Sequence, residues 1–105
     1  MTPPFRLTPR ALADLRSIGR YTRATWGAAQ RDRYLAALDR RFRWLAEAPN
    51  RGRPRPDVGE GYHCFPEGAH VVFYLIRDGG IDIIGVPHQA MDIIAHLAAR
   101  PSGPR

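Results

Sequence analysis

The spacing of hydrophobic residues changes once along the chain, and this change constrains the fold more than any other feature. Up to residue 48, apolar side chains recur every three or four positions, which is typical of helices that bury one face. Further along they occur in short continuous runs, and the longest is the six residues Val71–Ile76. A chain with helices first and strands afterwards is expected to adopt an α+β fold, in which the helices cover a sheet.

Two long helices are predicted in the first half of the chain. Thr8 can cap the first helix, Pro9 can take its first position and Gly27 can end it. The second helix is predicted from about Ala28 to Ala48, because a proline follows at position 49. Their short connection indicates a helical hairpin. We expect two apolar stripes to pack against each other: Leu12, Leu15 and Ile18 on the first helix, and Leu35, Leu38 and Phe42 on the second.

The second half predicts short strands and a final helix. Strands are expected at 62–65, 70–77 and 81–86, with turns at 66–68 and at Asp78–Gly79, a dipeptide typical of β-hairpins. Phe5–Leu7 alternates and predicts another short strand. Segment 50–61 is predicted to be a loop, 89–99 a helix and 101–105 a loose tail.

These elements predict one α+β domain over residues 1–105, with an ordered core from about 5 to 97. We expect an N-terminal strand and a helical hairpin packed on a small antiparallel sheet, with a short C-terminal helix. The sheet residues expected beneath the hairpin are Val71, Phe73 and Ile83.

Charge is distributed unevenly. The chain has 105 residues and a net charge of +6, and all 16 basic residues are arginine. Residues 1–57 hold 13 arginines and 5 acidic residues, whereas residues 58–105 hold 3 and 5. A basic half of this kind suits nucleic acid or an acidic protein. No run of about 20 apolar residues predicts a membrane span, and the N-terminus has no apolar signal core, so we expect a cytoplasmic protein.

Few residues predict catalysis or metal binding. The four histidines, at positions 63, 70, 88 and 96, lack the spacing of metal ligands, and the single Cys64 cannot form an internal disulfide. No phosphate-binding or dinucleotide-binding motif occurs, and no cofactor is expected. Ribonuclease chemistry requires a base, an acid and a cation. The available side chains for it are His88, Tyr74, Glu60 and Arg77, but each also has an ordinary structural interpretation.

The segment Arg51–Asp57 contains three arginines among glycine and prolines, which predicts an exposed basic loop. It lacks interleaved aromatic residues that would stack on bases, so direct sequence-specific recognition of nucleic acid is not expected. An anionic protein is the better partner. We therefore predict a partner-binding surface from the loop and the exposed face of the second helix, comprising Arg33, Arg40, Arg51, Arg53 and Arg55.

Three segments in combination resemble the ParE branch of the RelE/ParE toxin superfamily: Ala46–Arg55, Phe65–Tyr74 and Pro87–Asp92. The resemblance extends over about residues 5–97. It is also carried by Leu7–Pro9, Ala11, Asp14, Leu15, Ile18, Tyr21, Trp26, Gly27, Phe42 and Leu45.

The resemblance implies a helical hairpin on a small antiparallel sheet and a type II toxin–antitoxin module. It also implies a ParD-like acidic antitoxin as partner in a hetero-oligomer, and inhibition of DNA gyrase by protein–protein contact without catalysis. The family commonly has arginine where this chain has His63 or Cys64, and again where it has Gly85, and a leucine-like residue at Pro87. Because these arginines are absent, catalysis of phosphodiester cleavage is less expected for this chain.

Two alternatives remain. One is a ribosome-dependent mRNA endonuclease of the RelE kind, with His88 as its acid–base group. The other is a non-toxic remnant that acts only in an antitoxin complex. For the toxin, the surface that contacts the target is predicted at the C-terminal end and comprises His88, Met91, Asp92, Ile94 and Leu97.

Overall fold

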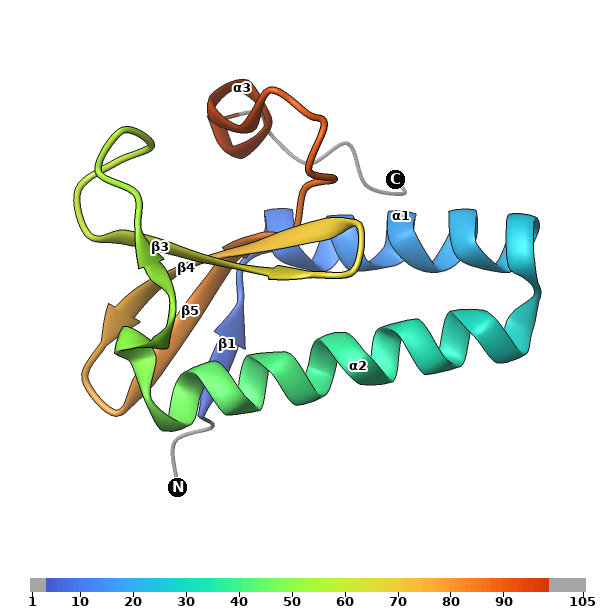
Figure 1. The fold of residues 1–105 in the computed structure, drawn as a ribbon, viewed down its shortest axis with the longest axis horizontal. Coiled ribbons are helices and arrows are strands. Elements are labelled where there is room, and N and C mark those ends of the chain that lie inside the picture. Colours follow the sequence, from blue (N-terminus) through green and yellow to red (C-terminus); the bar gives the residue numbers. More distant parts are fainter. Residues whose placement is uncertain (1–3, 99–105) are drawn as a thin grey trace.

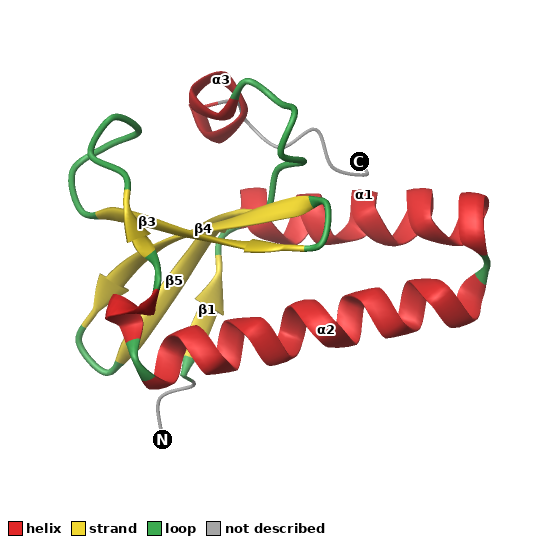
Figure 2. Cartoon of the chain, in the orientation of Figure 1, coloured by secondary structure: helices red, strands yellow, loops and turns green. Residues whose placement is uncertain are grey.

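The computed structural model describes residues 4–98. Its elements are β1 (Phe5–Leu7), α1 (Pro9–Trp26), α2 (Ala28–Glu47), the 3-10 turn η1 (Pro49–Arg51), β2 (Arg53–Pro54), β3 (Tyr62–Glu67), β4 (His70–Arg77), β5 (Gly80–Gly85) and α3 (Ile93–Ala98). The hairpin of α1 and α2 extends beyond the sheet, and α3 lies across the sheet from α2 (Figure 1, Figure 2). The predicted α+β class is confirmed. Within the described part of the chain, no helix is long and apolar enough to cross a membrane.

The sheet has five strands in the order β1-β5-β4-β3-β2. Strands β3, β4 and β5 pair antiparallel, as predicted for consecutive hairpins, and the unpredicted β2 pairs antiparallel to β3. β1 instead pairs parallel to β5, with Phe5 opposite Ile81. The sheet is therefore mixed and not purely antiparallel. The helical hairpin causes this difference, because it carries the chain away from β1 before the meander begins and leaves β1 beside the last strand.

The caps that the sequence predicts define both helices. Thr8 Oγ1 accepts a hydrogen bond from the backbone N–H of Ala11 (3.1 Å), and Pro9 occupies the first turn of α1. Gly27 lies between the helices with φ +94°, a conformation that other residues rarely adopt. Its N–H caps the Arg23 carbonyl of α1, and its carbonyl accepts the first hydrogen bond of α2. One glycine thus ends one helix and begins the next.

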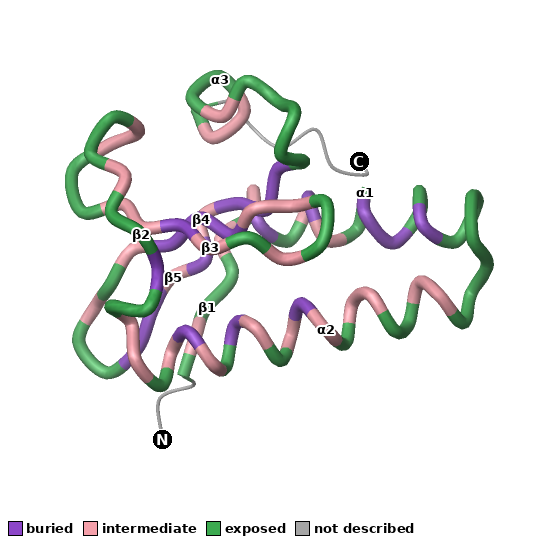
Figure 3. The backbone as a smooth tube through the Cα atoms, in the orientation of Figure 1, coloured by how far each residue is buried: buried purple, intermediate pink, exposed green. Residues whose placement is uncertain are grey.

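The core lies between the hairpin and one face of the sheet (Figure 3). Its buried residues are Ala11, Ile18, Leu38, Phe42, Leu45, Val72, Tyr74, Ile81, Ile83 and Val86. The predicted Ile18, Leu38, Phe42 and Ile83 are among them, and Leu15 and Leu35 pack against them while partly buried. Leu12 was predicted in the core but is 40% exposed, because Ala11 takes the position that faces the sheet.

The predicted facing of β4 was wrong by one residue. Val72 and Tyr74 point toward the hairpin, whereas Val71 is only half-buried. Phe73 is buried on the opposite face, where the Arg55 guanidinium lies 5.4 Å from its ring centroid. Successive strand residues point to opposite faces. Because both faces of this strand are covered, its run of six apolar residues shows no alternation from which the facing could be predicted.

The segment 50–61, predicted to be a loop, contains η1 and the short strand β2, with Arg53 opposite Cys64 in β3. The buried hydroxyl of Tyr74 fixes this segment: it donates to the Pro49 carbonyl and accepts from the Gly52 N–H (2.9 Å). A Cβ on Gly52 would lie 2.2 Å from the Tyr74 oxygen. The segment therefore lies directly against the sheet.

Two other boundaries differ from the prediction. β3 continues through Pro66 to Glu67, so the turn begins at Gly68, whose φ is +57°. The final helix begins at Ile93 and not at residue 89, because residues 88–92 are not helical and His88 forms an isolated bridge with His70. Residue 99 and the predicted tail 101–105 lie outside the described residues. The Asp78–Gly79 hairpin turn is confirmed, with Gly79 at φ +80°.

Candidate interaction groove

A groove of about 670 Å³ lies where α1, the N-terminal part of α2, the start of β4 and the segment after β5 meet. Its lining residues come from both halves of the sequence. They are Arg10, Ala13, Asp14, Arg16, Ser17, Ile18, Arg20, Tyr21, Thr22 and Trp26 from α1; Gln30 and Tyr34 from α2; and Ala69, His70, Val86, Pro87, His88, Met91 and His96.

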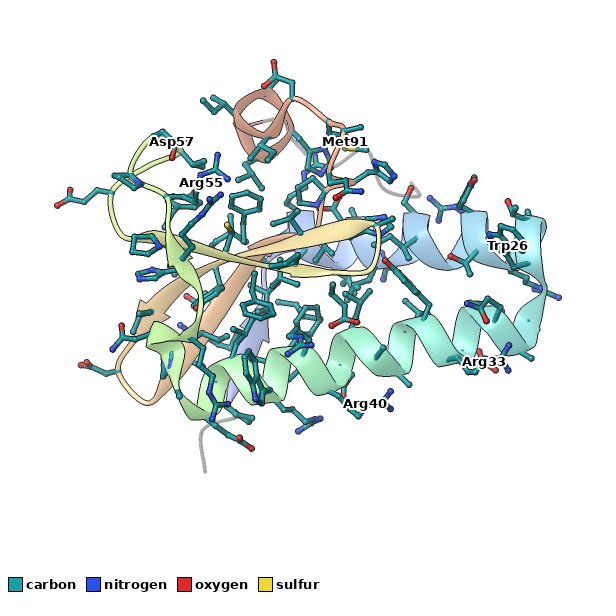
Figure 4. All side chains as sticks on the ribbon, viewed as in Figure 1. Trp26, Arg33, Arg40, Arg55, Asp57 and Met91 are labelled. Carbon is teal, nitrogen blue, oxygen red and sulfur yellow. The ribbon has the colours of Figure 1, made fainter. Side chains whose placement is uncertain are left out.

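The groove combines exposed apolar side chains with positive charge. Tyr21, Trp26 and Met91 are 66%, 70% and 48% exposed, although each is large and apolar. Figure 4 shows Trp26 at the far end of the helical hairpin and Met91 in the segment that leads into α3. Exposed apolar patches with polar rims are typical of surfaces that bind other macromolecules. Arg16 and Arg20, which are exposed and have no ion-pair partner within residues 4–98, supply the charge.

Asp14 is the only acidic residue among the described lining residues, and its carboxylate already has partners. It is 6% exposed and accepts hydrogen bonds from the Val86 N–H (2.8 Å) and from His96 Nε2 (2.9 Å), with Arg10 Nη1 at 3.6 Å. This side chain connects α1 to the end of β5 and to α3. Its negative charge is therefore used inside the protein, which leaves the groove surface positive.

A second cluster of groove residues is formed by Tyr34, His70 and His88. The Tyr34 hydroxyl lies 2.7 Å from His70 Nδ1, and the rings of His70 and His88 meet edge to face with centroids 5.5 Å apart. Burial, and secondarily the neighbouring His88, hold the pKa of His70 below its ordinary value of 6.5. Three of the four histidines in the chain thus line one groove.

The five arginines predicted to bind a partner do not form one surface. Figure 4 shows Arg33 and Arg40 along α2, whereas Arg55 lies across the sheet beside Asp57. Arg55 makes two hydrogen bonds to Asp57 (2.9 and 2.8 Å), which hold the pKa of Asp57 below its ordinary value. Arg55 is therefore largely neutralised within its own loop.

Arg51 lies over the Trp44 ring at 4.4 Å and donates to the Trp44 carbonyl. Arg53 is exposed on β2, and Arg40 is exposed on α2; neither has an ion-pair partner within the described chain. Arg33 is exposed and, within residues 4–98, forms side-chain hydrogen bonds to Gln30 alone, which lines the groove. Arg33 is thus the predicted arginine with a direct connection to the groove.

The residues predicted at the C-terminal surface have different roles. His88 and Met91 line the groove, and Ile94 is 57% exposed. The Asp92 carboxylate accepts the Ala95 N–H (3.2 Å) and so caps α3. Leu97 is half-buried against the sheet, where a Cβ on Gly85 would lie 2.5 Å from it. His88, Met91, Asp92 and Ile94 are exposed, and of these Asp92 is already engaged in capping α3.

The four side chains considered for ribonuclease chemistry are not brought together. Tyr74 is buried in the core, as its structural interpretation predicted, and Arg77 pairs with Asp82 (2.7 Å). Arg77 was predicted to be an exposed charge but is half-buried beside this carboxylate. Glu60 lies in the exposed loop before β3, and only His88 lines the groove. Over residues 4–98 no three His, Cys, Asp or Glu side chains are placed to hold a metal ion.

Sequence reasoning missed the groove residues of α1. Arg16 and Arg20 are four positions apart and lie on one helical face, so their spacing was a detectable signal. Trp26 lies at the end of the helix and is apolar, but it is exposed. The groove itself could not be predicted, because it depends on the positions of β4 and residues 86–91 relative to α1.

The helical hairpin on a five-stranded sheet is the fold of a known class of toxin–antitoxin proteins. A chain in the solved structure of the chromosomal ParDE TA system from P. aeruginosa superimposes with a TM-score of 0.69, covering 80% of this chain and 92% of that chain at 17% sequence identity. Residues 5–93 match the family model of the ParE toxin of type II toxin–antitoxin systems, parDE. The chain belongs to this family.

Curated relatives agree with this assignment. Toxin ParE1 of Caulobacter vibrioides is 39% identical over 94 residues, which cover 90% of this chain and 97% of that protein. Toxin ParE of Escherichia coli is 39% identical over 103 residues, covering 94% and 97%. The protein is thus the toxin component of a type II toxin–antitoxin system, as the resemblance of its sequence predicted.

Proposed function

We propose that this toxin inhibits DNA gyrase by protein–protein contact and is neutralised by a ParD-like acidic antitoxin. The observation that supports this proposal most strongly is the groove. It presents exposed aromatic side chains and arginines, and none of its described lining residues has a free carboxylate, which makes it the complement of an acidic, partly apolar protein segment. A target and an antitoxin in the cytoplasm would agree with the localisation expected from the sequence.

The antitoxin segment is proposed to fill the groove and to continue along α2. Its apolar residues would contact Tyr21, Trp26 and Met91, and its acidic residues would contact Arg16 and Arg20. Arg33 and Arg40 extend this basic surface along α2, and Arg51, Arg53 and Arg55 remain a secondary contact at the far end of the sheet. A segment that is disordered when free and folds on binding could cover surfaces this far apart.

The gyrase-binding surface is proposed at the C-terminal segment, with His88, Met91 and Ile94 as its contact residues. Asp92 and Leu97 would support that surface indirectly, through the cap of α3 and its packing on the sheet. His88 and Met91 also line the groove. Neutralisation can therefore be explained by overlap, because an antitoxin in the groove would cover part of the surface that contacts the target.

A non-enzymatic mechanism is favoured by two arginines of the sheet region, Arg55 and Arg77, which already have carboxylate partners. Arg55 is engaged by Asp57, and Arg77 by Asp82. Burial by itself would raise the pKa of Asp82, but hydrogen bonds from Arg6 and Arg77 outweigh it and lower the pKa. Each arginine that could stabilise the negative charge of a phosphorane is thus already paired with a carboxylate, Arg55 with Asp57 and Arg77 with Asp82.

The test combines three assays on the purified toxin. Supercoiling by gyrase on relaxed plasmid should be inhibited, and a stoichiometric amount of the ParD-like antitoxin should restore it. Cleavage of mRNA on translating ribosomes, abolished by His88→Ala, would instead support the endonuclease alternative. Antitoxin binding without either activity would support the non-toxic remnant.

A pair of variants tests the surface. Ile94→Arg should abolish inhibition of gyrase while antitoxin binding is retained, because Ile94 is exposed outside the groove. Ile76→Arg is the matched control, since this isoleucine is 42% exposed near the C-terminal end of β4 and does not line the groove. If Ile94→Arg still inhibits gyrase as strongly as Ile76→Arg does, the gyrase contact lies elsewhere, and the Arg51–Asp57 segment is the next candidate.

A further inference from the structure

Helix α3 lies against the sheet without contributing to the hydrophobic core (Figure 1). Within residues 4–98, none of its six residues is buried, and no residue after Val86 belongs to the core cluster. Ile93, His96 and Leu97 are half-buried and share one helical face. Ile94 is exposed outside that face. A helix this short is marginal in water by itself, so its position depends on what its inner face contacts.

Two contacts of different kinds hold this inner face. Leu97 packs at Gly85, where an added Cβ would lie 2.5 Å from the leucine methyl. His96 Nε2 lies 2.9 and 3.0 Å from the two carboxylate oxygens of Asp14, which is 82 positions earlier in the chain. The apolar contact has no preferred direction, so the helix could turn or slide over it. The hydrogen bond is directional and therefore fixes one orientation of α3.

The burial of Asp14 indicates that its role is to fix the positions of other segments. Its side chain is 7% exposed, and a buried carboxylate adds little net stability, because removing it from water costs about as much as its partners return. It does fix the atoms that must point at it. One is the Val86 N–H at the end of β5, and the other is His96 on α3. Asp14 thus aligns the last strand and the last helix with α1.

We propose that His96 is a positioning residue for inhibition of gyrase, because its hydrogen bond to Asp14 holds α3 in the orientation that presents Ile94. This inference rests on the proposed gyrase-binding surface. The His96 side chain is 18% exposed, so it acts through the position of the helix and not as a main contact. Without the hydrogen bond, α3 leaves the sheet and unwinds, while the helical hairpin and the sheet remain folded.

The substitutions follow from the geometry of the contact. His96→Leu keeps an apolar side chain on the inner face but removes the hydrogen bond. His96→Gln keeps a side-chain N–H donor for Asp14, so it should restore the contact. His63→Leu is the matched control, because His63 is also a half-buried histidine with a hydrogen-bonded ring, here to the Gly61 carbonyl (3.0 Å), but it lies on β3.

The first experiment measures the order of α3 in the free toxin by backbone ¹⁵N relaxation. Order parameters of residues 93–97 should be about 0.85 in the wild type and fall below about 0.6 in His96→Leu. They should stay near the wild-type value in His96→Gln and in His63→Leu. Residues 5–86 should keep their order parameters in all variants, because the core does not include α3.

The second experiment compares gyrase inhibition with antitoxin binding. The toxin concentration for half-inhibition of supercoiling should rise about tenfold or more in His96→Leu, as expected for the loss of a hydrogen bond to a charged group. It should remain near the wild-type value in His96→Gln and in His63→Leu. The Kd of the ParD-like antitoxin should change less than about threefold in every variant, because its proposed contacts on α1, such as Tyr21 and Arg20, do not depend on α3.

A double-mutant cycle tests whether His96 and Asp14 act through the same contact. Asp14→Asn replaces the carboxylate with an amide of the same shape and should also weaken gyrase inhibition. Combined with His96→Leu, it should weaken inhibition no further than the more severe single variant does. Fully additive effects would show that the two side chains act separately and would overturn the proposal.

The remaining outcomes separate this inference from the proposed function. An ordered α3 or unchanged inhibition in His96→Leu overturns the positioning role. A parallel loss of gyrase inhibition and antitoxin binding in that variant also overturns it, because His96 would then support the whole fold. Wild-type toxin that does not inhibit gyrase overturns the proposed function, whereas the order parameters still show whether the contact with Asp14 holds α3 in place.

Discussion

Gly52 and Tyr74 provide the sharpest test of how the basic segment after α2 is held. Replacing Gly52 with alanine would place a Cβ 2.2 Å from the Tyr74 hydroxyl oxygen and 2.8 Å from two ring carbons. The ring is fully buried, so it cannot move aside into solvent. Overpacking costs about 1–3 kcal/mol, and disturbing the two hydrogen bonds of the hydroxyl adds about 1 kcal/mol each. Gly52→Ala should therefore lower the free energy of unfolding by about 3 kcal/mol or more.

A double-mutant cycle identifies the cause of that loss. Tyr74→Phe alone should cost about 2 kcal/mol, since it leaves the buried N–H of Gly52 and the Pro49 carbonyl without their partner. Once the hydroxyl is absent, Gly52→Ala should cost about 1–2 kcal/mol less than in the wild type. Urea unfolding of the four proteins measures both quantities. A cost below about 1 kcal/mol for Gly52→Ala, or purely additive effects, would refute the account of this contact.

Three further predictions follow from the core, the rim charge and the histidine of β4. Phe42 is 2% exposed and its ring meets that of Phe5 at 5.3 Å, so Phe42→Ala should lower the unfolding free energy by about 3–5 kcal/mol; a loss under about 1 kcal/mol would contradict its place in the core. Arg20→Gln should slow antitoxin association at low salt about three- to tenfold more than Arg43→Gln, which removes the same charge outside the groove, and high salt should abolish the difference. Burial lowers the pKa of His70 in the folded protein below 6.5, so just below pH 6.5 the unfolded chain binds more protons than the folded one. The contribution of His70 to stability should therefore be lost as pH falls through that range. In thermal melts, the difference in Tm between wild type and His70→Asn should be larger at pH 7.5 than at pH 5.

The helices could be predicted from the sequence because their signals are local. Thr8 and Gly27 act at the ends of α1 through contacts within four residues, so their effect does not depend on the rest of the fold. The Asp78–Gly79 turn is local in the same sense. Strand β2 had no such signal. Its Arg53 and Pro54 resemble loop residues, and they pair with β3 because Tyr74, distant in sequence, anchors the preceding turn.

The sheet facing and the groove were not predictable for a related reason. A strand that is buried on both faces shows no alternation, so Val71 and Val72 are equivalent in the sequence and only the packed structure distinguishes them. The arginines were predicted from their number in the sequence. Their availability depends on neighbouring carboxylates, however, and Asp57 neutralises Arg55 whereas Arg16 has no such partner within residues 4–98.

Under the proposed function, the position of the C-terminal segment explains how one antitoxin can both bind and neutralise this toxin. Residues 88–91 are connected to the fold at their start by the His70 bridge and beyond their end by the His96–Asp14 hydrogen bond. The segment is thus fixed with Met91 facing the groove and Ile94 exposed beyond it. A partner that fills the groove must contact Met91, so antitoxin and gyrase compete for that side chain even though Ile94 stays outside the groove. The two complexes are then mutually exclusive.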